Sequence, residues 1–162
     1  MAAKPYVYLE TTVISYRVAN PSRDVVVAAR QALTREWWDG RLAHHQPVVS
    51  PVVEQEIRDG DPEMAARRVA VVSHFSSLAA DVRIDALISQ VAARRILPEK
   101  ALGDLAHLSF AAFHGVTLMV TWNFRHLANR RILWRLQREF GLQGYVLPDV
   151  FTPEQLLLGR GL

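Results

Sequence analysis

The sequence predicts an α/β fold in which helices cover both faces of a parallel β-sheet. Short apolar segments rich in β-branched and aromatic residues alternate along the chain with longer segments of helical periodicity, as is typical of this fold class. The length of 162 residues suits a single domain over residues 1–162 with a core of its own. Hydrophobic residues make up 50% of the chain, which argues against disorder.

Turn-forming residues divide the first half of the chain into its predicted elements. Asn20-Pro21-Ser22 opens a helix with one apolar face, and Asp39-Gly40 ends it. The segment 59–62, Asp-Gly-Asp-Pro, breaks the chain after a further short helix. We therefore expect strands at residues 6–9 and 47–50, helices at 20–38, 52–57 and 63–80, and a short extended piece at 82–84.

Proline and glycine mark the predicted boundaries in the second half as well. Pro98 stands where a proline is favoured in the first turn of a helix, and Gly115 follows the end of that helix. Thr152 and Gln155 have the spacing of a capping box, and Gly159 ends the short helix that they start. We expect helices at residues 86–97, 98–114, 124–140 and 152–158, and strands at 116–120 and 145–147.

Four residues with side-chain oxygen atoms follow predicted strands or lie in early helical turns. They are Glu10, Glu56, Asp104 and Asn123. Oxygen atoms are the ligands that Mg²⁺ and Mn²⁺ prefer, and Mg²⁺ needs only one or two protein carboxylates. Because ligands bind beyond the carboxyl ends of parallel strands, we predict that these residues form one metal site. Gly103 supports this prediction, because a glycine inside a helix costs about 1 kcal/mol relative to alanine and suggests that another group approaches the backbone there.

Each of the four also has an ordinary structural interpretation. Glu10 could face solvent at the end of a strand. Glu56 could be a surface acid like its neighbour Glu54. Asp104 could be favoured near a helix N-terminus by the helix macrodipole. Asn123 could be a turn residue, since asparagine caps and bends chains readily. The order of the four along the chain is therefore more informative than any one of them.

Four short motifs occur in a fixed order along the chain. Glu-Thr-Thr (10–12) follows the first strand, and Ser-x₅-Glu-Ile (50–57) follows the second. Gly-Asp-x-x-His-Leu (103–108) lies on a helix, and Thr-Trp-Asn (121–123) follows a later strand. This order resembles the PIN-domain nucleases and, within them, the VapC-type toxins of bacterial toxin–antitoxin pairs. The resemblance extends from Tyr6 to the ending Thr152–Leu157, and includes a PIN subgroup in which Glu-Thr-Thr and Thr-Trp-Asn occur together.

The resemblance implies a function, a cofactor and partners. It implies a PIN-like domain that hydrolyses RNA phosphodiester bonds with a metal-activated water, using Mg²⁺ or Mn²⁺. The four acidic positions of the family fall on Glu10, Glu56, Asp104 and Asn123. Thr11 and Thr121 could orient a ligand or a water molecule. The resemblance also implies a cognate antitoxin protein, a homodimer and a cytoplasmic location.

Two departures from the family pattern leave other functions open. The family usually has aspartate where Glu10 stands and commonly a fourth acid where Asn123 stands. A weakened metal site would leave an RNA-binding or protein-binding module that hydrolyses nothing. A phosphatase or a receiver domain is a weaker alternative, because no aspartate ends the first strand and no glycine-rich phosphate loop follows any strand.

Positive charge is concentrated in the segment 124–140, although the net charge of the chain is only +3. The segment suits a polyanion such as single-stranded or loop RNA, but it could also be a solvated helix face. Trp122, beside the proposed site, could be a stacking platform for a base or a core tryptophan. The candidate RNA-binding arginines are Arg125, Arg130, Arg131 and Arg135, with Arg138 in the same segment.

Composition excludes several other classes of protein. The absence of cysteine excludes disulfides and thiolate metal sites. No apolar run approaches the roughly 18 residues that suggest a membrane span, and residues 1–5 leave no room for the apolar core of a signal peptide. We therefore expect a soluble, intracellular protein. His107 and His126 lie near the proposed site in sequence, but we do not include them among the catalytic candidates.

Overall fold

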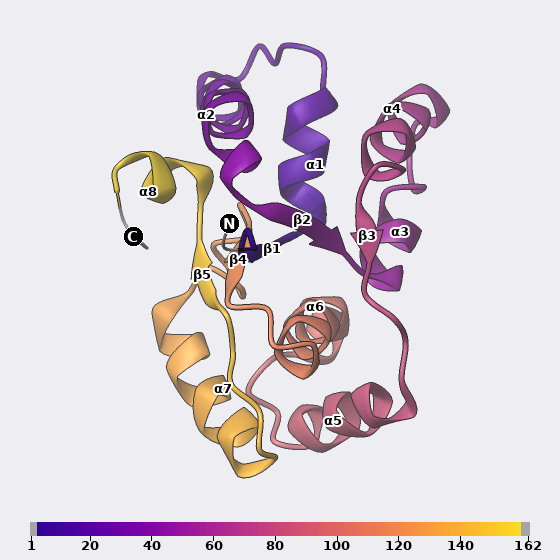
Figure 1. Cartoon of the computed structure of the whole chain (residues 1–162), viewed down its shortest axis with the longest axis vertical. Coiled ribbons are helices and arrows are strands. Elements are labelled where there is room, and N and C mark those ends of the chain that lie inside the picture. The colour runs from indigo at the N-terminus through magenta and orange to yellow at the C-terminus, as the bar shows by residue number, and fades with distance from the viewer. Residues whose placement is uncertain (1–2, 160–162) are drawn as a thin grey trace.

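Five parallel strands form the central sheet, in the spatial order β3-β2-β1-β4-β5 (Figure 1). The computed structural model describes residues 3–159. Every neighbouring pair of strands in this sheet is parallel, so the predicted fold class is confirmed. The strands are β1 (Tyr6–Leu9), β2 (Gln46–Val49), β3 (Ser76–Ser77), β4 (Leu118–Val120) and β5 (Asp149–Phe151).

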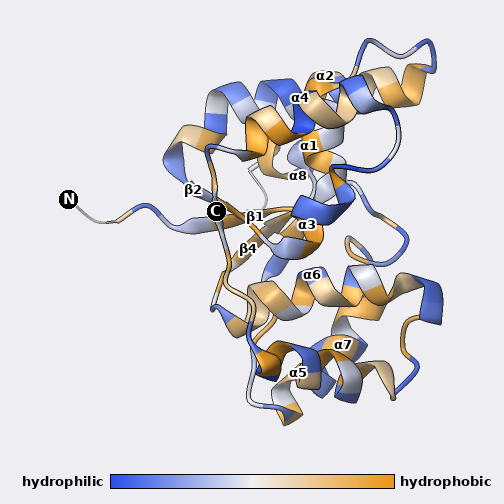
Figure 2. Ribbon diagram, turned by 90° about the vertical axis from the view of Figure 1, so that its right-hand side faces the viewer, coloured by the Kyte–Doolittle hydropathy of each residue, from blue (hydrophilic) through white to orange (hydrophobic). Residues whose placement is uncertain are grey.

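Helices cover both faces of the sheet, as predicted (Figures 1 and 2). One layer contains α1 (Thr11–Val18), α2 (Val25–Arg41), α4 (Pro62–Val72) and α8 (Pro153–Leu157), and these helices pack on one another. The other layer contains α5 (Val82–Ala92), α6 (Leu102–Phe113) and α7 (Arg130–Leu142). The short helix α3 (Pro51–Glu56) follows β2, and 3₁₀ turns precede β2 and α6 at Leu42–His44 and Glu99–Ala101. Among the helices of residues 3–159, none is both long and apolar enough to cross a membrane.

The central strands are buried on both faces, and this burial explains their sequences. Val7, Tyr8 and Leu9 of β1 are fully buried, as are Met119 and Val120 of β4. Strands covered by helices on both sides have continuous apolar runs instead of alternating ones. In Figure 2 these strands form an orange, hydrophobic centre between the two helical layers. Each of these two strands ends where polar residues begin, at Glu10 after β1 and at Thr121 after β4.

The order of the strands determines where a ligand can bind. From β1 the chain builds β2 and β3 on one side, and then returns to place β4 and β5 on the other side. The direction of winding reverses at β1 and β4, and ligands of such sheets bind at the carboxyl ends of the strands at this point. Glu10 follows β1 there, and its backbone N–H donates to the Val120 carbonyl at 3.1 Å. Thr121 follows β4 at the same edge.

The first two helices differ from the prediction. Helix α1 was not predicted, because it starts directly after β1 with no intervening loop and spans only eight residues. The segment 20–22 joins α1 to α2 and is held by Gln31, whose side chain bonds to the Asn20 carbonyl and the Ser22 N–H, both at 3.0 Å. Helix α2 begins at Val25, capped by Asp24, and continues through residues 39–40 to Arg41.

The extended piece predicted at residues 82–84 is wrong. Asp81 caps α5, and its side chain accepts a hydrogen bond from the Arg83 N–H at 2.9 Å, so helix begins at Val82. The edge strand lies earlier, at Ser76–Ser77, because the helix predicted to reach residue 80 ends at Val72. Two serines carry no apolar pattern, and their strand forms only by pairing with β2.

The ends of the basic helix and of the last strand are also corrected. Residues 124–127 form turns, and α7 begins at Arg130 because Asn129 caps it by accepting from the Ile132 N–H at 3.2 Å. The last strand lies at Asp149–Phe151 and not at 145–147, since it is these residues that pair with β4. The predicted capping box of Thr152 and Gln155 is confirmed.

Candidate metal centre

Glu10 lies at the centre of the site and is almost completely buried, with 4% of its surface exposed. Three donors hold its Oε2 atom: the Thr12 N–H at 3.1 Å, the Thr12 hydroxyl at 2.5 Å and the Thr121 hydroxyl at 2.7 Å. These donors come from the residues that follow β1 and β4, so both strand ends fix the carboxylate. Within residues 3–159, no hydrogen bond reaches the other oxygen, Oε1. Because the hydrogen bonds to Oε2 fix the orientation of the carboxylate, Oε1 is held in place and is available to a ligand.

Glu56 reaches the same place from the last residue of α3. Its Oε2 atom accepts hydrogen bonds from the Thr11 hydroxyl and from His107 Nε2, the latter at 3.1 Å. A Cβ atom on residue 103 would lie 3.3 Å from Glu56 Oε1. The glycine in α6 therefore has the role predicted for it, since a side chain does approach the backbone there. The neighbouring acid Glu54 is not part of this group.

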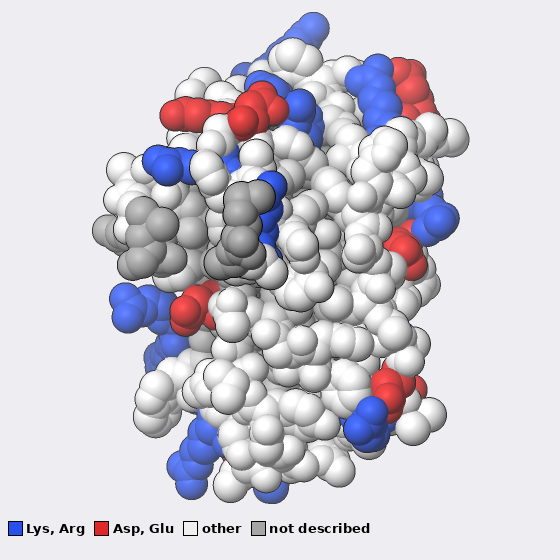
Figure 3. Space-filling model, viewed as in Figure 1, with Lys and Arg blue, Asp and Glu red and all other residues white. Residues whose placement is uncertain are grey.

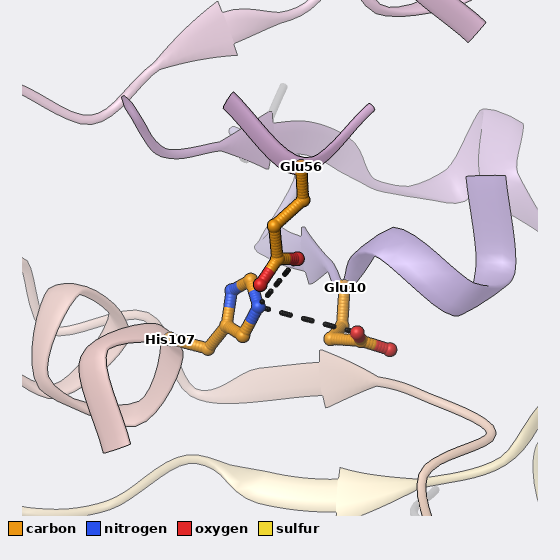
Figure 4. A group of neighbouring side chains, drawn as sticks. All are labelled: Glu10, Glu56 and His107. Carbon is orange, nitrogen blue, oxygen red and sulfur yellow. Dashed lines mark hydrogen bonds and ion pairs between the residues drawn. The ribbon is translucent and has the colours of Figure 1, made fainter. Parts of the chain in front are cut away.

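His107 completes the group and is fully buried. Its Nε2 atom lies 3.1 Å from Glu56 Oε2 and 4.0 Å from Glu10 Oε1 (Figure 4). One ligand atom from each of the three residues lies within 4.8 Å of the others. On the far side of the ring, Nδ1 lies 2.7 Å from the Tyr8 hydroxyl, which in turn lies 2.6 Å from Ser50 Oγ. Two buried hydroxyls therefore hold the imidazole in place.

Sequence reasoning left His107 out of the site, although a signal for it exists. The residue stands three positions after Asp104 in the Gly-Asp-x-x-His-Leu motif. Residues three apart share one face of a helix, so the motif places His107 beside the candidate ligand Asp104.

The charges of the three side chains depend on one another. Burial alone would raise the pKa of Glu56, but the hydrogen bond and charge of His107, together with the Thr11 hydroxyl, lower it below its usual range. Burial would likewise lower the pKa of His107, but the Glu56 hydrogen bond and the charges of Glu10, Glu56 and Asp104 raise it. Burial raises the pKa of Tyr8 well above its usual value, so its hydroxyl keeps its proton. When it is protonated, the imidazole acts as the counter-charge of the carboxylates.

Asp104 and Asn123 form a second group at the same edge of the sheet. Asp104 Oδ1 accepts from Asn123 Nδ2 at 2.9 Å, and Oδ2 lies 2.7 Å from His126 Nδ1. Asn123 Oδ1 accepts from the His126 N–H at 3.1 Å. The Thr121 hydroxyl connects the two groups, because it accepts from the Asn123 N–H at 2.9 Å and donates to Glu10. The four predicted residues therefore lie at one edge of the sheet, but Asp104 and Asn123 pair with His126 and not with the compact group.

The compact group fits a divalent cation. Two carboxylates and one imidazole supply both oxygen and nitrogen donors, and the nitrogen suits first-row transition metals better than Mg²⁺. Buried histidines that bind metals are oriented by a partner on their second ring nitrogen, and Tyr8 occupies that position for His107. Thr11 and Thr121 each donate to one of the carboxylates, and Thr12, which was not predicted, donates to Glu10 as well. The residues present could hold Mn²⁺ with less compromise than Mg²⁺.

No protein-family model matches the chain, and no curated protein matches it. The geometry of the two groups is therefore the main basis for a functional proposal, together with the order of the sequence motifs.

Trp122 is not the stacking platform that was considered for it. Its side chain is only 4% exposed, and its Nε1–H donates to the Thr34 hydroxyl at 2.7 Å. The indole packs in the core beside Tyr16, so the core interpretation is the correct one. The candidate RNA-binding arginines, by contrast, are exposed at the surface: Arg125, Arg130, Arg131 and Arg135.

Proposed function

We propose that the protein is a divalent-metal-dependent endoribonuclease of the PIN type, which hydrolyses RNA phosphodiester bonds. One observation carries the proposal. Glu10, Glu56 and His107 bring their ligand atoms within 4.8 Å of one another at the point where the winding of the sheet reverses. Burying the Glu10 carboxylate, with the half-buried Glu56 beside it, is costly unless a positive charge compensates it, and a cation would do so.

The side chains of the metal centre would have different roles in hydrolysis. A divalent cation bound there would lower the pKa of a water molecule and offset negative charge on a phosphate oxygen. Glu10 offers Oε1 because the hydroxyls of Thr12 and Thr121 hold Oε2. The Asp104–His126 pair lies next to this group and is less buried than Glu10, so it is positioned to orient water or accept a proton at Oδ2.

The biological setting that we propose follows from the order of the motifs along the chain. We propose that the protein is the toxin of a toxin–antitoxin pair, acts in the cytoplasm as a homodimer and is silenced by a cognate antitoxin protein. Sequencing the adjacent genes gives a direct test, since a small neighbouring gene for a DNA-binding protein would support this setting.

A binding module without hydrolytic activity is the second candidate, and one observation favours it. His107 already contacts Glu56 at 3.1 Å and lies 4.0 Å from Glu10. A protonated imidazole in this position neutralises carboxylate charge without any metal. If the imidazole keeps its proton near neutral pH, the ion pair of His107 with Glu56 excludes a metal cation. The protein would then bind RNA or another protein without hydrolysing it.

A cleavage assay distinguishes the two candidates. Labelled RNA is incubated with the protein in Mn²⁺, in Mg²⁺ and in EDTA, and calorimetry measures the binding of each cation without RNA. The proposal predicts that RNA is cleaved in Mn²⁺ or Mg²⁺ but not in EDTA, and that the protein binds Mn²⁺ more tightly than Mg²⁺. Glu10→Gln should lose both RNA cleavage and metal binding. Glu54→Gln is the matched control, because it removes the same charge from an acid outside the group. Cleavage in EDTA, or full activity of Glu10→Gln, would refute the proposal.

A further inference from the structure

Trp134 is the one tryptophan whose ring lies mostly in solvent, with 74% of its surface exposed. Trp37 and Trp122 are buried, and Trp38 is partly buried against the core. The opposite face of α7 carries the core residues Leu136 and Phe140, so the position of Trp134 is not a consequence of poor packing. A single exposed apolar side chain is ordinary on a protein surface, so any role of Trp134 depends on the groups that surround it.

Arginines surround this tryptophan. On a helix the neighbours of residue 134 are the residues three and four positions away, which here are Arg130, Arg131, Gln137 and Arg138. The ring separates two hollows of the surface. One, of about 270 Å³, is lined by Trp134 with arginines 135 and 138 and with Glu139, which Arg94 pairs at 3.2 Å. The other, of about 490 Å³, is lined by Trp134 with Arg130, Gln137, Asp149 and several apolar side chains. The aromatic face therefore stands between two recesses, each bordered by at least one guanidinium group and one carboxylate.

These arginines are free to meet an anion. In residues 3–159, none of the arginines of α7 forms an ion pair with an acidic side chain. Arginines elsewhere do so, as with Arg17 and Asp39 at 3.1 Å and Arg83 and Asp81 at 2.8 Å. No ring–ring or cation–π contact of the described chain covers Trp134 either. Basic side chains are visible along the lower left edge of the molecule in Figure 3, where Figure 1 places α7.

We infer that this face of α7 binds single-stranded RNA, with a base stacked on Trp134 and phosphates held by Arg130, Arg131 and Arg138. An exposed aromatic ring among unpaired arginines has the chemistry of a single-strand binding surface, in which stacking and phosphate contacts act together. The larger hollow also has apolar walls, but an apolar protein partner would leave the arginines of this face without counter-charges. The inference rests on the proposed function, because it assigns the path of that enzyme's substrate.

The Trp134 face of α7 is close in the chain to the loop of the metal centre. The loop that carries Asn123 and His126 leads directly to Asn129, which caps the first turn of α7. Arg130 and Arg131 are in that first turn, and Trp134 is one turn further along. The proposed RNA-binding face therefore begins on the helix that directly follows the loop of Asn123 and His126.

The test measures binding separately from cleavage. A fluorescein-labelled, unstructured RNA oligonucleotide is titrated with the protein in EDTA, and fluorescence anisotropy gives the Kd at several salt concentrations. Trp134→Ala should weaken binding by roughly 5- to 140-fold, the range for loss of one stacked base. Trp134→Phe should restore most of the affinity, because a phenyl ring also stacks. Replacing Arg130, Arg131 and Arg138 with alanine should reduce the salt slope by about 0.7 for each lost phosphate contact.

Two matched controls exclude general effects of the substitutions. Leu142→Ala removes another exposed apolar side chain from α7. Arg23→Ala with Arg41→Ala removes exposed charges from the segment before α2 and from the last residue of α2, in the other layer. Both should leave the RNA affinity close to that of the parent, and circular dichroism should be the same for all variants.

Each outcome decides a different question. An unchanged Kd for Trp134→Ala would overturn the inference, even if the enzyme cleaves RNA in Mn²⁺. A change in sedimentation with unchanged RNA affinity would also overturn it, and would assign the surface to a second copy of the chain. Loss of binding in Trp134→Ala together with no cleavage by the parent in any metal would uphold the surface and refute the nuclease.

Discussion

Replacing Gly103 with alanine separates the stability of the fold from the geometry of the metal centre. Gly103 lies in the first turn of α6, and a Cβ atom there would be 3.3 Å from Glu56 Oε1. Alanine favours a helix over glycine by up to about 1 kcal/mol. Glu56 is a flexible side chain with 36% of its surface exposed, so it can move by the small distance required. We expect the metal-free variant to match the parent or to melt up to about 3 °C higher.

The same displacement should weaken metal binding. It moves the Glu56 carboxylate away from Glu10 and His107, and so disturbs one of the three ligands. A tenfold loss of affinity would reduce the stabilisation by a saturating cation by about 1.4 kcal/mol. Melting curves in EDTA and in Mn²⁺ measure both effects. Gly40→Ala is the control, because Gly40 also lies in a helix and has nothing within 4 Å of its Cβ position.

Two results would contradict this reasoning. If Gly103→Ala gains as much stability from Mn²⁺ as the parent, Glu56 is not a ligand. If the variant is much less stable in EDTA, the methyl group meets a neighbour that cannot move, and the Glu56 side chain is more rigid than its exposure suggests. Gly40→Ala should respond to Mn²⁺ like the parent in either case.

Two further predictions concern the same group of residues. In EDTA, stability should be highest between about pH 4.5 and 6.5, the usual pKa values of Glu56 and His107. Because folding raises the pKa of His107, this residue stabilises the fold fully below pH 6.5, and its contribution is lost as the pH rises through the folded-state pKa. Because folding lowers the pKa of Glu56, that residue stabilises the fold fully above pH 4.5, and its contribution is lost as the pH falls through the folded-state pKa. Melting temperatures across pH should show both declines, and His107→Gln should remove the decline on the alkaline side; an unaltered profile would contradict the ion pair. Thr121→Val should cost about 1–3 kcal/mol in urea unfolding, because it leaves the Asn123 N–H without its acceptor and removes a donor to Glu10. Equal stability of the variant and the parent would mean that these bonds contribute little.

The parts of the site that sequence could predict are those that depend on position along a strand. Glu10 and Thr121 directly follow apolar runs, and parallel strands bring their carboxyl ends to one edge of the sheet. Gly103 was informative because its cost in a helix needed a reason. These inferences require only local patterns and the rules of sheet topology.

The remaining features depend on contacts between distant segments. His107 meets Glu56 across 51 residues, and nothing local to either residue indicates the pairing. The strand of Ser76 and Ser77 exists only because β2 lies beside it. Trp122 and Trp134 have the same side chain, and only the packing of α2 and α7 decides that the first is buried and the second exposed.

The buried hydroxyls beside His107 allow its proton to change position without movement of the chain. When the ring carries its proton on Nε2, Nδ1 accepts from the Tyr8 hydroxyl, and Tyr8 accepts from Ser50. When the proton is on Nδ1, both bonds reverse, so that Nδ1 donates to Tyr8 and Tyr8 donates to Ser50. Only two hydroxyl hydrogens rotate between these arrangements, and every heavy atom keeps its place. Exposing the Nε2 lone pair therefore costs the hydrogen bond to Glu56 Oε2, 3.1 Å away, but requires no rearrangement of the chain.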